Sequence, residues 1–302
     1  MKSYPLQKLD AFTTGKSSGN PAACVTLNCQ DDIRPEMMQQ IAFELKDFVS
    51  EVGFVWPSQE ADFELRYFSS EQEVPFCGHA TIAILHRLIS TSPELIERKE
   101  LLVRTRHSSL KVINQIKDEN LIFIHTPKPQ FVPVALNHCD IAEALNLPIN
   151  GLDQAQPPVL INLGQNILLM RLYDTQTCID CQPDFAKLRQ FCLENSFDIL
   201  TVYVQDKNFP DVPLRTRVFP PVYGYLEDPA TGSGNAALGY HLFTSRQWDG
   251  ELTTIEQGKD SDNPNLVHLK CVDGMVLIGG SAVCRIEGNY FLHGEYLTRV
   301  GW

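Results

Sequence analysis

Apolar and polar positions alternate along the chain in short runs that predict many strands and few helices. Apolar residues spaced three and four apart, each series behind a proline that can begin a helix, predict helices over 35–46 and 183–195. Two other stretches are apolar on almost every side and predict buried helices, over 80–88 and from 234 to about 244. Strand-like runs are found in both halves, at 4–12, 52–56, 63–68, 110–116, 121–125, 159–163, 167–172, 199–204, 214–219, 266–272 and 275–286.

The predicted elements recur in the same order in the two halves of the chain. In each half a proline-initiated helix precedes two strands, the second strand carries an Arg-x-Phe segment, and a glycine-containing loop leads into an apolar helix. The matching segments are Arg66-Tyr67-Phe68 with Glu73–Thr81, and Arg217-Val218-Phe219 with Glu227–Asn235. A single repeat of this length predicts two similar lobes, since a solenoid needs several shorter units. The expected fold class is therefore α+β, with two pseudo-symmetric lobes that each wrap a curved, mostly antiparallel sheet or barrel around a central helix.

The boundary between the lobes is expected where three prolines interrupt the pattern, around 126–133. We assign residues 1–127 to the N-terminal lobe and 128–286 to the C-terminal lobe, and we expect a C-terminal strand, about 287–302, to complete the N-terminal lobe. Ligands often bind where lobes meet, so the cleft between the lobes is the expected place for chemistry.

Composition and charge argue against several classes of function. Of the 302 residues, 43% are hydrophobic and 21% are charged, as in ordinary soluble globular proteins, and the net charge is −12. An acidic chain without a basic cluster argues against nucleic-acid and anionic-membrane partners. The chain has no apolar run of membrane-spanning length, and its first residues lack the apolar region of a signal peptide. Nine cysteines, an odd number, then predict reduced thiols in the cytoplasm.

The motifs predict neither a metal site nor a nucleotide site. Cys178-Ile179-Asp180-Cys181 is the only C-x-x-C; it has no second pair to complete a tetrahedral zinc site and lacks a thioredoxin context. Gly232-x-Gly234 comes too late in the chain for a dinucleotide loop and belongs to no G-x-G-x-x-G. We therefore expect no cofactor and no metal.

The two glycine-containing loops are the strongest candidates for ligand binding. Each precedes a buried helix, whose first N–H groups and positive dipole end suit a carboxylate or a developing oxyanion. The first loop is Cys77-Gly78-His79 and the second is Asp228–Gly234. The alternative is that the glycines only close turns and the hydroxyl groups cap helices. The duplication of the loop favours a ligand site.

Ionisable side chains at or near these loops form a candidate proton-transfer set. Glu51 lies at the start of an otherwise apolar strand. This position suits a group that alternately donates and accepts protons. Its counterpart in the second half falls around Leu200 or Thr201, neither of which exchanges protons at neutral pH. His79 could relay a proton or hold the substrate, and Asp228 supplies a second carboxylate. Taken singly, each has a structural alternative: a solvated strand-start glutamate, a hydrogen-bonding histidine and a turn-forming aspartate.

At these residues the chain resembles the PhzF-like family of phenazine-biosynthesis isomerases. The resemblance covers the chain from Leu9 to the final strands, with several separate motifs in the same order and spacing. The matching motifs are Asp10-Ala11-Phe12-Thr13, Gly19-Asn20-Pro21-Ala22-Ala23, Ser50-Glu51-x-x-Phe54-Val55, Arg66-Tyr67-Phe68, Glu73–Thr81 and Glu227–Ser233.

This resemblance implies the diaminopimelate epimerase fold and a cofactor-independent isomerase that is usually a homodimer. The family's phenazine enzyme moves a hydrogen within trans-2,3-dihydro-3-hydroxyanthranilate. By resemblance, Glu51 is the general acid/base, with His79 and Asp228 as its catalytic partners. The implied ligand is a small anionic metabolite in the cleft between the lobes. The implied substrate-binding residues are Asn20, Gly78, Thr231, Gly232 and Ser233.

Two departures from the family pattern affect the expected pocket. Glu256-Gln257-Gly258 is followed by residues 260–265 without the arginine that is usual there, and Val52-Gly53 replaces the usual Thr-Ala. Two other functions stay open. One is a two-thiol epimerase, with Cys77 as one thiol but Thr231 at the paired position. The other is a catalytically inactive small-molecule-binding protein of the same fold, against which the joint presence of an acid/base, an imidazole and a second carboxylate argues.

Overall fold

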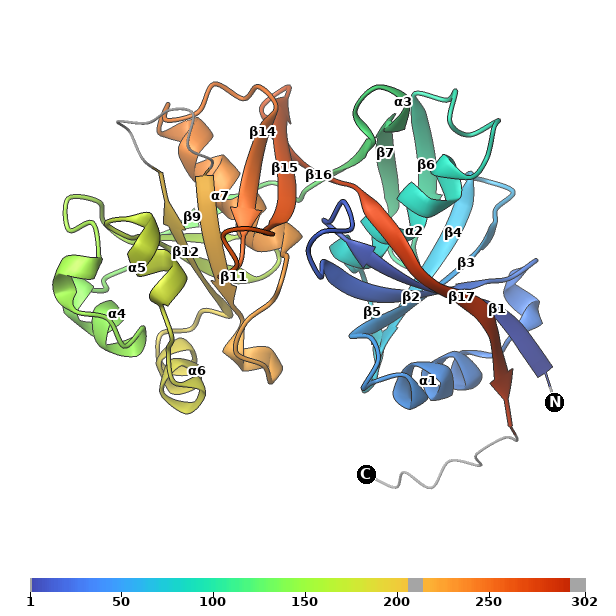
Figure 1. Ribbon diagram of the computed structural model, residues 1–302, viewed down its shortest axis with the longest axis horizontal. Helices are drawn as coiled ribbons and strands as arrows, with labels where there is room; N and C mark the ends of the chain where they lie inside the picture. The colour runs from blue at the N-terminus through green and yellow to red at the C-terminus, as the bar shows by residue number, and fades with distance from the viewer. Residues whose placement is uncertain (1, 206–213, 294–302) are drawn as a thin grey trace. The chain divides into compact units, whose positions relative to one another are not determined.

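The computed structural model describes residues 2–205 and 214–293. It has the predicted α+β fold, and the chain divides into two compact units (Figure 1). The first unit is discontinuous: it contains the chain up to Ile124 and again from Gly280 onward. The second unit is the continuous stretch His125–Gly279. Part of the strand expected over about 287–302 falls on 294–302, outside the described residues.

The first unit is built on a mostly antiparallel sheet. Its strands are β1 (Lys2–Ala11), β2 (Asn20–Thr26), β3 (Glu51–Pro57), β4 (Phe63–Ser69), β5 (Glu73–Val74), β6 (Glu100–Arg104), β7 (Ser109–Gln115), β8 (Leu121–His125) and β17 (Ala282–Leu292). The sheet runs from β17 through β1, β2, β3, β4, β6 and β7 to β8, and the short β5 pairs with β4. The pairs β2–β3 and β4–β6 are parallel and the others are antiparallel, which places the starts of β2 and β3 at one edge.

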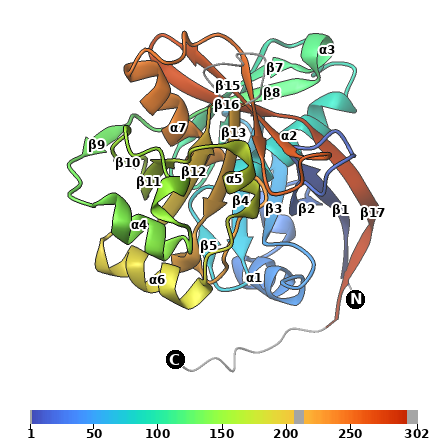
Figure 2. The same cartoon turned by 60° about the vertical axis from the view of Figure 1, so that its left-hand side comes forward.

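Two helices pack against opposite faces of this sheet. The sheet curves around α2 (Gly78–Ser90), which contacts β1, β2, β3 and β17 (Figures 1 and 2). On the other face α1 (Pro35–Glu44) packs against β3 and β4. The residues of β3 alternate accordingly, because Val52 and Phe54 belong to the core under α1 whereas Gly53 touches Ile84 of α2. The first unit also contains η1 (Gln30–Asp32) and α3 (Ile116–Glu119).

The second unit has a sheet of the same kind. Its strands are β9 (Gln130–Val132), β10 (Val159–Asn162), β11 (Asn166–Arg171), β12 (Ile199–Val204), β13 (Leu214–Phe219), β14 (Thr253–Gln257), β15 (Asn265–Val272) and β16 (Met275–Gly280). They pair in chain order, with β11–β12 and β13–β14 parallel and the other pairs antiparallel. The order of parallel and antiparallel pairs therefore repeats that of the first unit.

The helices of the second unit repeat the arrangement of the first. The central helix is α7 (Gly232–Thr244), which contacts β10, β11, β12 and β15. The other face carries the apolar core, to which α4 (His138–Ala144), α5 (Thr175–Asp180) and α6 (Phe185–Glu194) contribute; η2 (Ile149–Gly151) and η3 (Pro221–Tyr223) are short. Two pseudo-symmetric units, each with a sheet around a central helix, confirm the predicted fold class. Across residues 2–205 and 214–293, none of the helices has both the length and the apolar character that a membrane crossing needs.

The strand predicted over 275–286 is wrong in one respect, because the structure divides it into β16 and β17. The break falls at Ser281, whose carbonyl accepts the backbone N–H of Phe12 at 2.8 Å. The chain passes from the second unit to the first just before this break, between Gly279 and Gly280. The apolar pattern continues through the break, so it gave no sign of the change of partner.

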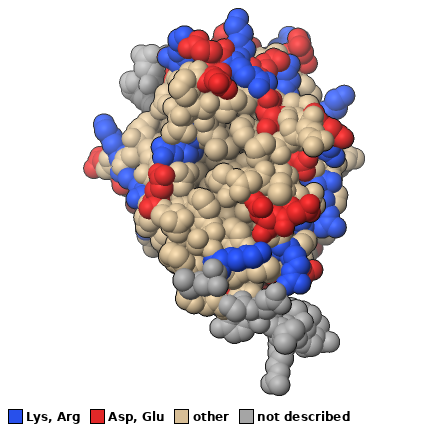
Figure 3. Space-filling view, turned by 90° about the vertical axis from the view of Figure 1, so that its right-hand side faces the viewer, with Lys and Arg blue, Asp and Glu red and all other residues tan. Residues whose placement is uncertain are grey.

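Charged side chains of both signs are interspersed on the face of the molecule shown in Figure 3. Many in the first unit are paired: Lys8–Asp10, Arg87–Glu287, Arg98–Asp62, Arg104–Glu60, Lys111–Glu100 and Lys117–Glu97. Asp10 is buried, but the other pairs are exposed or partly exposed, and exposed pairs contribute about 0–1 kcal/mol each. In each pair a carboxylate neutralises the positive charge of a neighbouring lysine or arginine.

Candidate active site

Glu51 is the first residue of β3, at the sheet edge where β2 and β3 both begin. The residues that follow it, from Val52 to Trp56, are buried. Glu51 itself pairs with Ala22 of β2 and Ser69 of β4, and its side chain is 23% exposed. The strand therefore holds a carboxylate at the boundary between the apolar core and solvent.

Cys77 and His79 lie at the start of α2. Cys77 is the N-cap residue, with an extended backbone, and Gly78 is the first residue of the helix. The backbone N–H and the hydroxyl group of Thr81 both donate to the Cys77 carbonyl, at 3.0 and 2.6 Å. The Thr81 hydroxyl also bonds the buried hydroxyl of Tyr67 at 2.7 Å. These bonds fix the first helical turn, and with it the positions of the Cys77 and His79 side chains.

The side chains of Glu51, Cys77 and His79 meet at this edge of the first unit. His79 Nε2 lies 3.1 Å from Glu51 Oε2, and its ring nitrogens lie 3.4 Å (Nδ1) and 3.8 Å (Nε2) from Cys77 Sγ. Glu51 Oε2 is shielded from solvent and accepts no hydrogen bond of good geometry, so its contact with His79 is one of charge and proximity. We call these three residues the triad.

The environment of the triad favours a protonated His79. Burial opposes the charged imidazole, but interactions with Cys77 and Glu51 outweigh it and raise the pKa of His79 well above its ordinary value. Burial also raises the pKa of the Cys77 thiol, which is therefore neutral near neutral pH. The Glu51 carboxylate, with Oε2 3.1 Å from His79 Nε2, is then the negatively charged neighbour of His79 that favours its charged form. The pair is then an imidazolium beside a carboxylate.

Three other residues surround the triad in the first unit. Asn20 begins β2 at the same sheet edge as Glu51 and is 2% exposed. A Cβ on Gly78 would meet no atom nearer than the Phe76 ring, at 3.8 Å, so packing does not require glycine there. Phe76 is 43% exposed and its ring packs edge-on against Tyr67. The open space at Gly78 and the exposed ring leave room for a small molecule at the start of α2.

In the second unit, the loop before α7 is held by a buried hydrogen-bond network. Its centre is Gln257, which is fully buried at the end of β14. Gln257 Oε1 accepts from the Thr231 N–H at 2.9 Å and from Asn235 Nδ2 at 2.7 Å. Its Nε2 donates to the Asp228 carbonyl at 2.7 Å and to the Thr231 hydroxyl at 3.1 Å. Gln257 thus fixes the loop from Asp228 to the start of the helix.

The predicted site residues of the second unit lie together on this loop. Thr231 is the N-cap of α7, followed by Gly232 and Ser233 as the first helical residues. The Thr231 hydroxyl donates to the Asp228 carboxylate, and the backbone N–H of Asp228 donates to Val218 of β13 at 3.0 Å. Asp228, Thr231, Gly232 and Ser233 therefore form a second cluster, in a different unit from the triad.

Both loops share one feature, an arginine that binds a glutamate of the following loop. Arg66 donates to both carboxylate oxygens of Glu73 at 2.7 Å, and Arg217 binds Glu227 in the same two-pronged way. Each guanidinium also lies 5.2 Å from the ring centre of the phenylalanine two residues on. The predicted correspondence of the two Arg-x-Phe segments is thus present in three dimensions.

Strand register corrects one predicted correspondence. Arg66 pairs with Phe54 of β3, and Arg217 pairs with Val202 of β12, which makes Phe54 and Val202 equivalent. Counting back three residues from each, the equivalent of Glu51 is Ile199, not Leu200 or Thr201 as predicted. Ile199 is buried and has no ionisable group. Aligning the starts of α2 and α7 matches Cys77 with Thr231, since both are N-cap residues, and His79 with Ser233, so no member of the triad is matched with an ionisable residue of the second unit.

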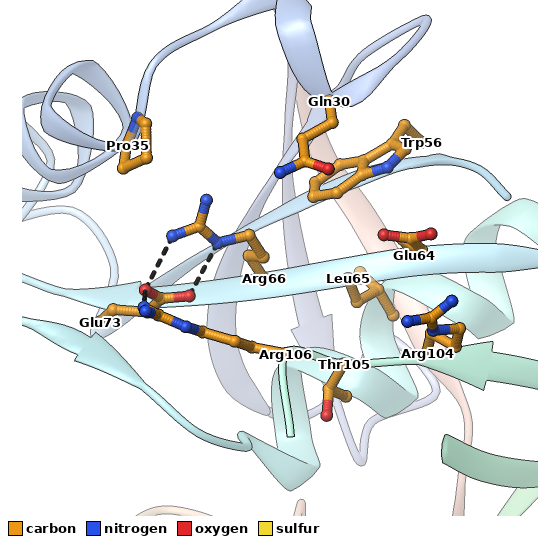
Figure 4. A pocket seen from close by; sticks show the side chains of 10 residues that line it. All are labelled: Gln30, Pro35, Trp56, Glu64, Leu65, Arg66, Glu73, Arg104, Thr105 and Arg106. Atoms are coloured by element: carbon orange, nitrogen blue, oxygen red, sulfur yellow. Dashed lines mark hydrogen bonds and ion pairs between the residues drawn. The ribbon is translucent and has the colours of Figure 1, made fainter. Parts of the chain in front are cut away.

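A hollow in the first unit lies away from the triad. It has a volume of about 380 Å³ and is drawn in Figure 4. Glu73 accepts from Arg66 and from Arg106 there, and Arg104 pairs with Glu60. These contacts leave the arginines neutralised by carboxylates of the protein. The residues that line the hollow are Gln30, Pro35, Trp56, Glu64, Leu65, Arg66, Glu73, Arg104, Thr105 and Arg106.

The segment after Gln257, in which the sequence lacks the arginine usual in the family, is held by an arginine from another strand. Arg215 of β13 donates from Nη1 to the Gly258 carbonyl at 3.1 Å and to the Asp260 carbonyl at 3.4 Å, and it pairs with Glu256. Arg215 is 5% exposed. Its guanidinium therefore supports the backbone of this segment and is committed to protein groups.

Sequence reasoning found Glu51 and His79 but missed two residues of these clusters. Cys77 was identified as part of the first glycine-containing loop and as one thiol of a two-thiol epimerase, but not as a neighbour of Glu51 and His79. Gln257 appeared only within a family motif, and nothing in its neighbourhood indicated that it would reach the loop before α7. The contacts of Cys77 and Gln257 can be recognised only when the positions of β3, β14 and the starts of α2 and α7 are known.

Comparison with known proteins gives a consistent result over nearly the whole chain. A family model described as phenazine biosynthesis-like protein matches residues 9–288. An uncharacterized isomerase of Bacillus subtilis, YfhB, is 28% identical over 272 residues, which cover 89% of this chain and 91% of the relative. The trans-2,3-dihydro-3-hydroxyanthranilate isomerase of Pseudomonas aeruginosa is 27% identical over 302 aligned residues, which cover 94% of this chain and 98% of the relative.

A solved structure agrees with these sequence matches. The crystal structure of a PhzF-family phenazine biosynthesis protein from Bacillus anthracis matches with a TM-score of 0.83 at 25% identity, covering 97% of this chain and 100% of the other. The predicted resemblance and fold class are therefore confirmed. The chain belongs to the phenazine biosynthesis-like protein family.

Proposed function

We propose that the protein is a cofactor-independent isomerase that moves a proton between carbon atoms of a small anionic substrate, with Glu51 as the general acid/base. The observation that carries the proposal is the 3.1 Å contact between Glu51 Oε2 and His79 Nε2 at the start of a buried helix. A positioned carboxylate beside an imidazolium is a suitable pair for proton transfer at carbon. The reaction class is supported by the names of the relatives, which are isomerases.

In the proposed reaction, the Glu51 carboxylate accepts a proton from a carbon whose electron pair can be delocalised into the substrate. The intermediate is an enolate- or dienolate-like anion, and Glu51 is then a carboxylic acid. Glu51 returns the proton to a second carbon, so that the substrate is rearranged without gain or loss of atoms. His79 stabilises the anionic form of Glu51 at the beginning and end of the cycle.

The start of α2 is the proposed binding site for the negative charge of the substrate. Its first N–H groups lack partners within the helix and lie at the positive end of the helix dipole. The absence of a side chain on Gly78 lets an anion approach this backbone closely. The exposed ring of Phe76 offers an apolar surface against which a cyclic substrate can pack.

The residues of the second unit enter the proposal through the sequence resemblance. Asp228, Thr231, Gly232 and Ser233 are proposed to act on the same substrate as the triad. The start of α7 supplies a second set of helix N–H groups, which suits a carboxylate or a ring substituent. Asn20, buried at the same sheet edge as Glu51, is proposed to hold the substrate next to it.

The test uses trans-2,3-dihydro-3-hydroxyanthranilate, the substrate named for one relative, together with a panel of small cyclic carboxylates. Turnover in deuterated water is followed by proton NMR, which reports both the product and the label at each carbon. Wild type is compared with Glu51→Gln, and with Glu64→Gln as a matched control. Glu64 is a half-buried strand glutamate of the same unit whose carboxylate accepts from Ser58 and lies outside the triad.

We expect Glu51→Gln to lower turnover by at least about 10²-fold and Glu64→Gln to leave it unchanged. His79→Ala should slow turnover by about 10²-fold, and Asp228→Asn should reduce it if the second cluster shares the substrate. Turnover by Glu51→Gln at the wild-type rate would refute the proposal. Tight binding of a panel compound that wild type never converts would instead favour the inactive binding protein.

A further inference from the structure

We propose that the triad is also a zinc site, and that zinc bound there blocks the proton transfer. The proposed inhibition rests on the proposed function, whereas the binding of zinc does not. Sequence spacing predicted no metal site, because the carboxylate comes from β3 and the other two donors from the start of α2. The fold brings together one carboxylate oxygen, one thiol sulfur and one imidazole nitrogen.

The distances between these donors are close to those of a tetrahedral zinc site. The three ligand atoms lie within 4.8 Å of one another, and no other such group of three was found among the described residues. His79 Nε2 is 3.1 Å from Glu51 Oε2 and 3.8 Å from Cys77 Sγ. With metal–ligand bonds of about 2.0–2.3 Å, neighbouring ligands of tetrahedral zinc lie about 3.3–3.5 Å apart. The two separations that involve His79 Nε2 therefore differ from tetrahedral values by only a few tenths of an ångström.

A second observation points to a cation at this place. Glu51 Oε2 is shielded from solvent and accepts no hydrogen bond of good geometry, so a buried lone pair faces the other two donors. Carboxylate, thiolate and imidazole are the usual protein ligands of zinc, and two negative ligands balance the charge of Zn²⁺. The positive end of the α2 dipole repels a cation and so limits the affinity of the site for zinc. Three protein ligands leave the fourth position open to water or substrate.

Zinc in this position removes both groups that the isomerisation needs. The Oε2 lone pair of Glu51 and the Nε2 lone pair of His79 become metal bonds, so neither group is available for a proton. Cys77 binds as the thiolate and His79 as the neutral imidazole, so the thiol proton and the Nε2 proton of the imidazolium both pass to solvent. Because coordination is reversible, a chelator should restore the free pair. Cys77 thus acquires a role that proton transfer alone does not give it.

The experiment titrates the reduced, chelator-treated full chain with Co²⁺, as a coloured substitute for zinc, and then displaces it with Zn²⁺. The exposed thiols of Cys29 and Cys139 are replaced by serine throughout, because they could bind metal by themselves. On this background Cys77→Ala and His79→Asn are compared with the unmodified triad. Cys24→Ala serves as the matched control, since Cys24 is a buried thiol of the same unit outside the triad.

We expect one equivalent of Co²⁺, with thiolate-to-cobalt absorption that Cys77→Ala abolishes and Cys24→Ala preserves. His79→Asn should keep the absorption but weaken binding by at least about 10- to 100-fold. Stoichiometric binding without the thiolate band, or no binding at all, would overturn the zinc site. In the activity arm, zinc should stop turnover and a chelator should restore it. Absence of turnover in the metal-free enzyme refutes the proposed function, whereas continued turnover with zinc bound refutes the inhibition.

Discussion

Replacing Gln257 by methionine should destabilise the loop before α7 without creating a cavity. Methionine has a similar volume and flexibility, so the change removes polar contacts while packing is largely kept. The Thr231 N–H loses its acceptor, and Asn235 loses one of its two acceptors. The Asp228 carbonyl also loses the donor at 2.7 Å. The Thr231 hydroxyl loses a donor at 3.1 Å as well, so the substitution acts on four groups at one end of α7.

The expected loss follows from the cost of leaving buried groups without partners. Thr231 is 8% exposed and Asn235 and Gln257 are fully buried, so water cannot readily replace the lost bonds. One buried donor without a partner costs about 1–3 kcal/mol, and the three groups that lose one partner each add a part of that. We expect the free energy of unfolding to fall by about 2–4 kcal/mol. Turnover should fall as well, because Asp228 and the start of α7 lose their common support.

Urea unfolding followed by circular dichroism, with the slope compared between variants, measures this loss. The matched control is Gln190→Met, which removes an exposed amide on α6 that donates only to Glu194 in the same helix. This control should change the free energy of unfolding by less than about 0.5 kcal/mol. A similarly small change for Gln257→Met would refute the reasoning, because it would show that the network does not hold the loop.

Two further predictions test the first unit. Gly53→Ala should lower the free energy of unfolding by about 1–3 kcal/mol, because the new Cβ would lie 2.2 Å from Cδ1 of the fully buried Ile84. Adding Ile84→Val, which removes that methyl group, should recover part of the loss in urea unfolding; no recovery would exclude this clash as the cause. Hydrogen bonds from Arg66, assisted by Arg106, lower the pKa of Glu73, so its stabilising contribution is present above the unfolded pKa and is lost as pH falls through the lowered folded value. The difference in unfolding free energy between wild type and Glu73→Gln should therefore shrink on acidification from pH 7 to about pH 3, and a constant difference would contradict this explanation.

The predicted helices and strands were most accurate where local chemistry determined the structure. The strand over 199–204 has the predicted bounds, because a run of buried β-branched and aromatic residues favours one conformation. Asn137 caps α4 and accepts from the Asp140 N–H at 2.9 Å, which is a common role of asparagine at a helix start. Here the decisive contacts lie within a few residues of one another.

β2 was missed because its local signals indicate a turn. Gly19 and Pro21 favour a break in the chain, yet Asn20–Thr26 is a strand between β1 and β3. Pro21 is tolerated because pairing with β3 begins one residue later, at Ala22. Strand formation at this position depends on two neighbours that the local sequence does not contain.

The site could be predicted only in part, because its geometry also depends on residues that are far apart in the sequence. Glu51 and His79 were identified by residue type, by their places before apolar elements and by the family resemblance. Their contact could not be predicted, because it depends on how α2 packs against the start of β3. The arrangement of Cys77 and the network around Gln257 likewise depends on side-chain packing.

The pairing of β1 with β17 also constrains how the protein folds during synthesis. Lys2 is paired with Leu292, so β1 can pair with β17 only after the residues near 292 have been synthesised. The second unit is continuous and interrupts the first, so it can fold on the ribosome while β1 still lacks this partner. Contacts of such long sequence separation form slowly. We therefore expect the edge of β1 to be the last backbone to gain protection from hydrogen exchange in the nascent protein, and the surface through which a chaperone would engage the unfinished chain.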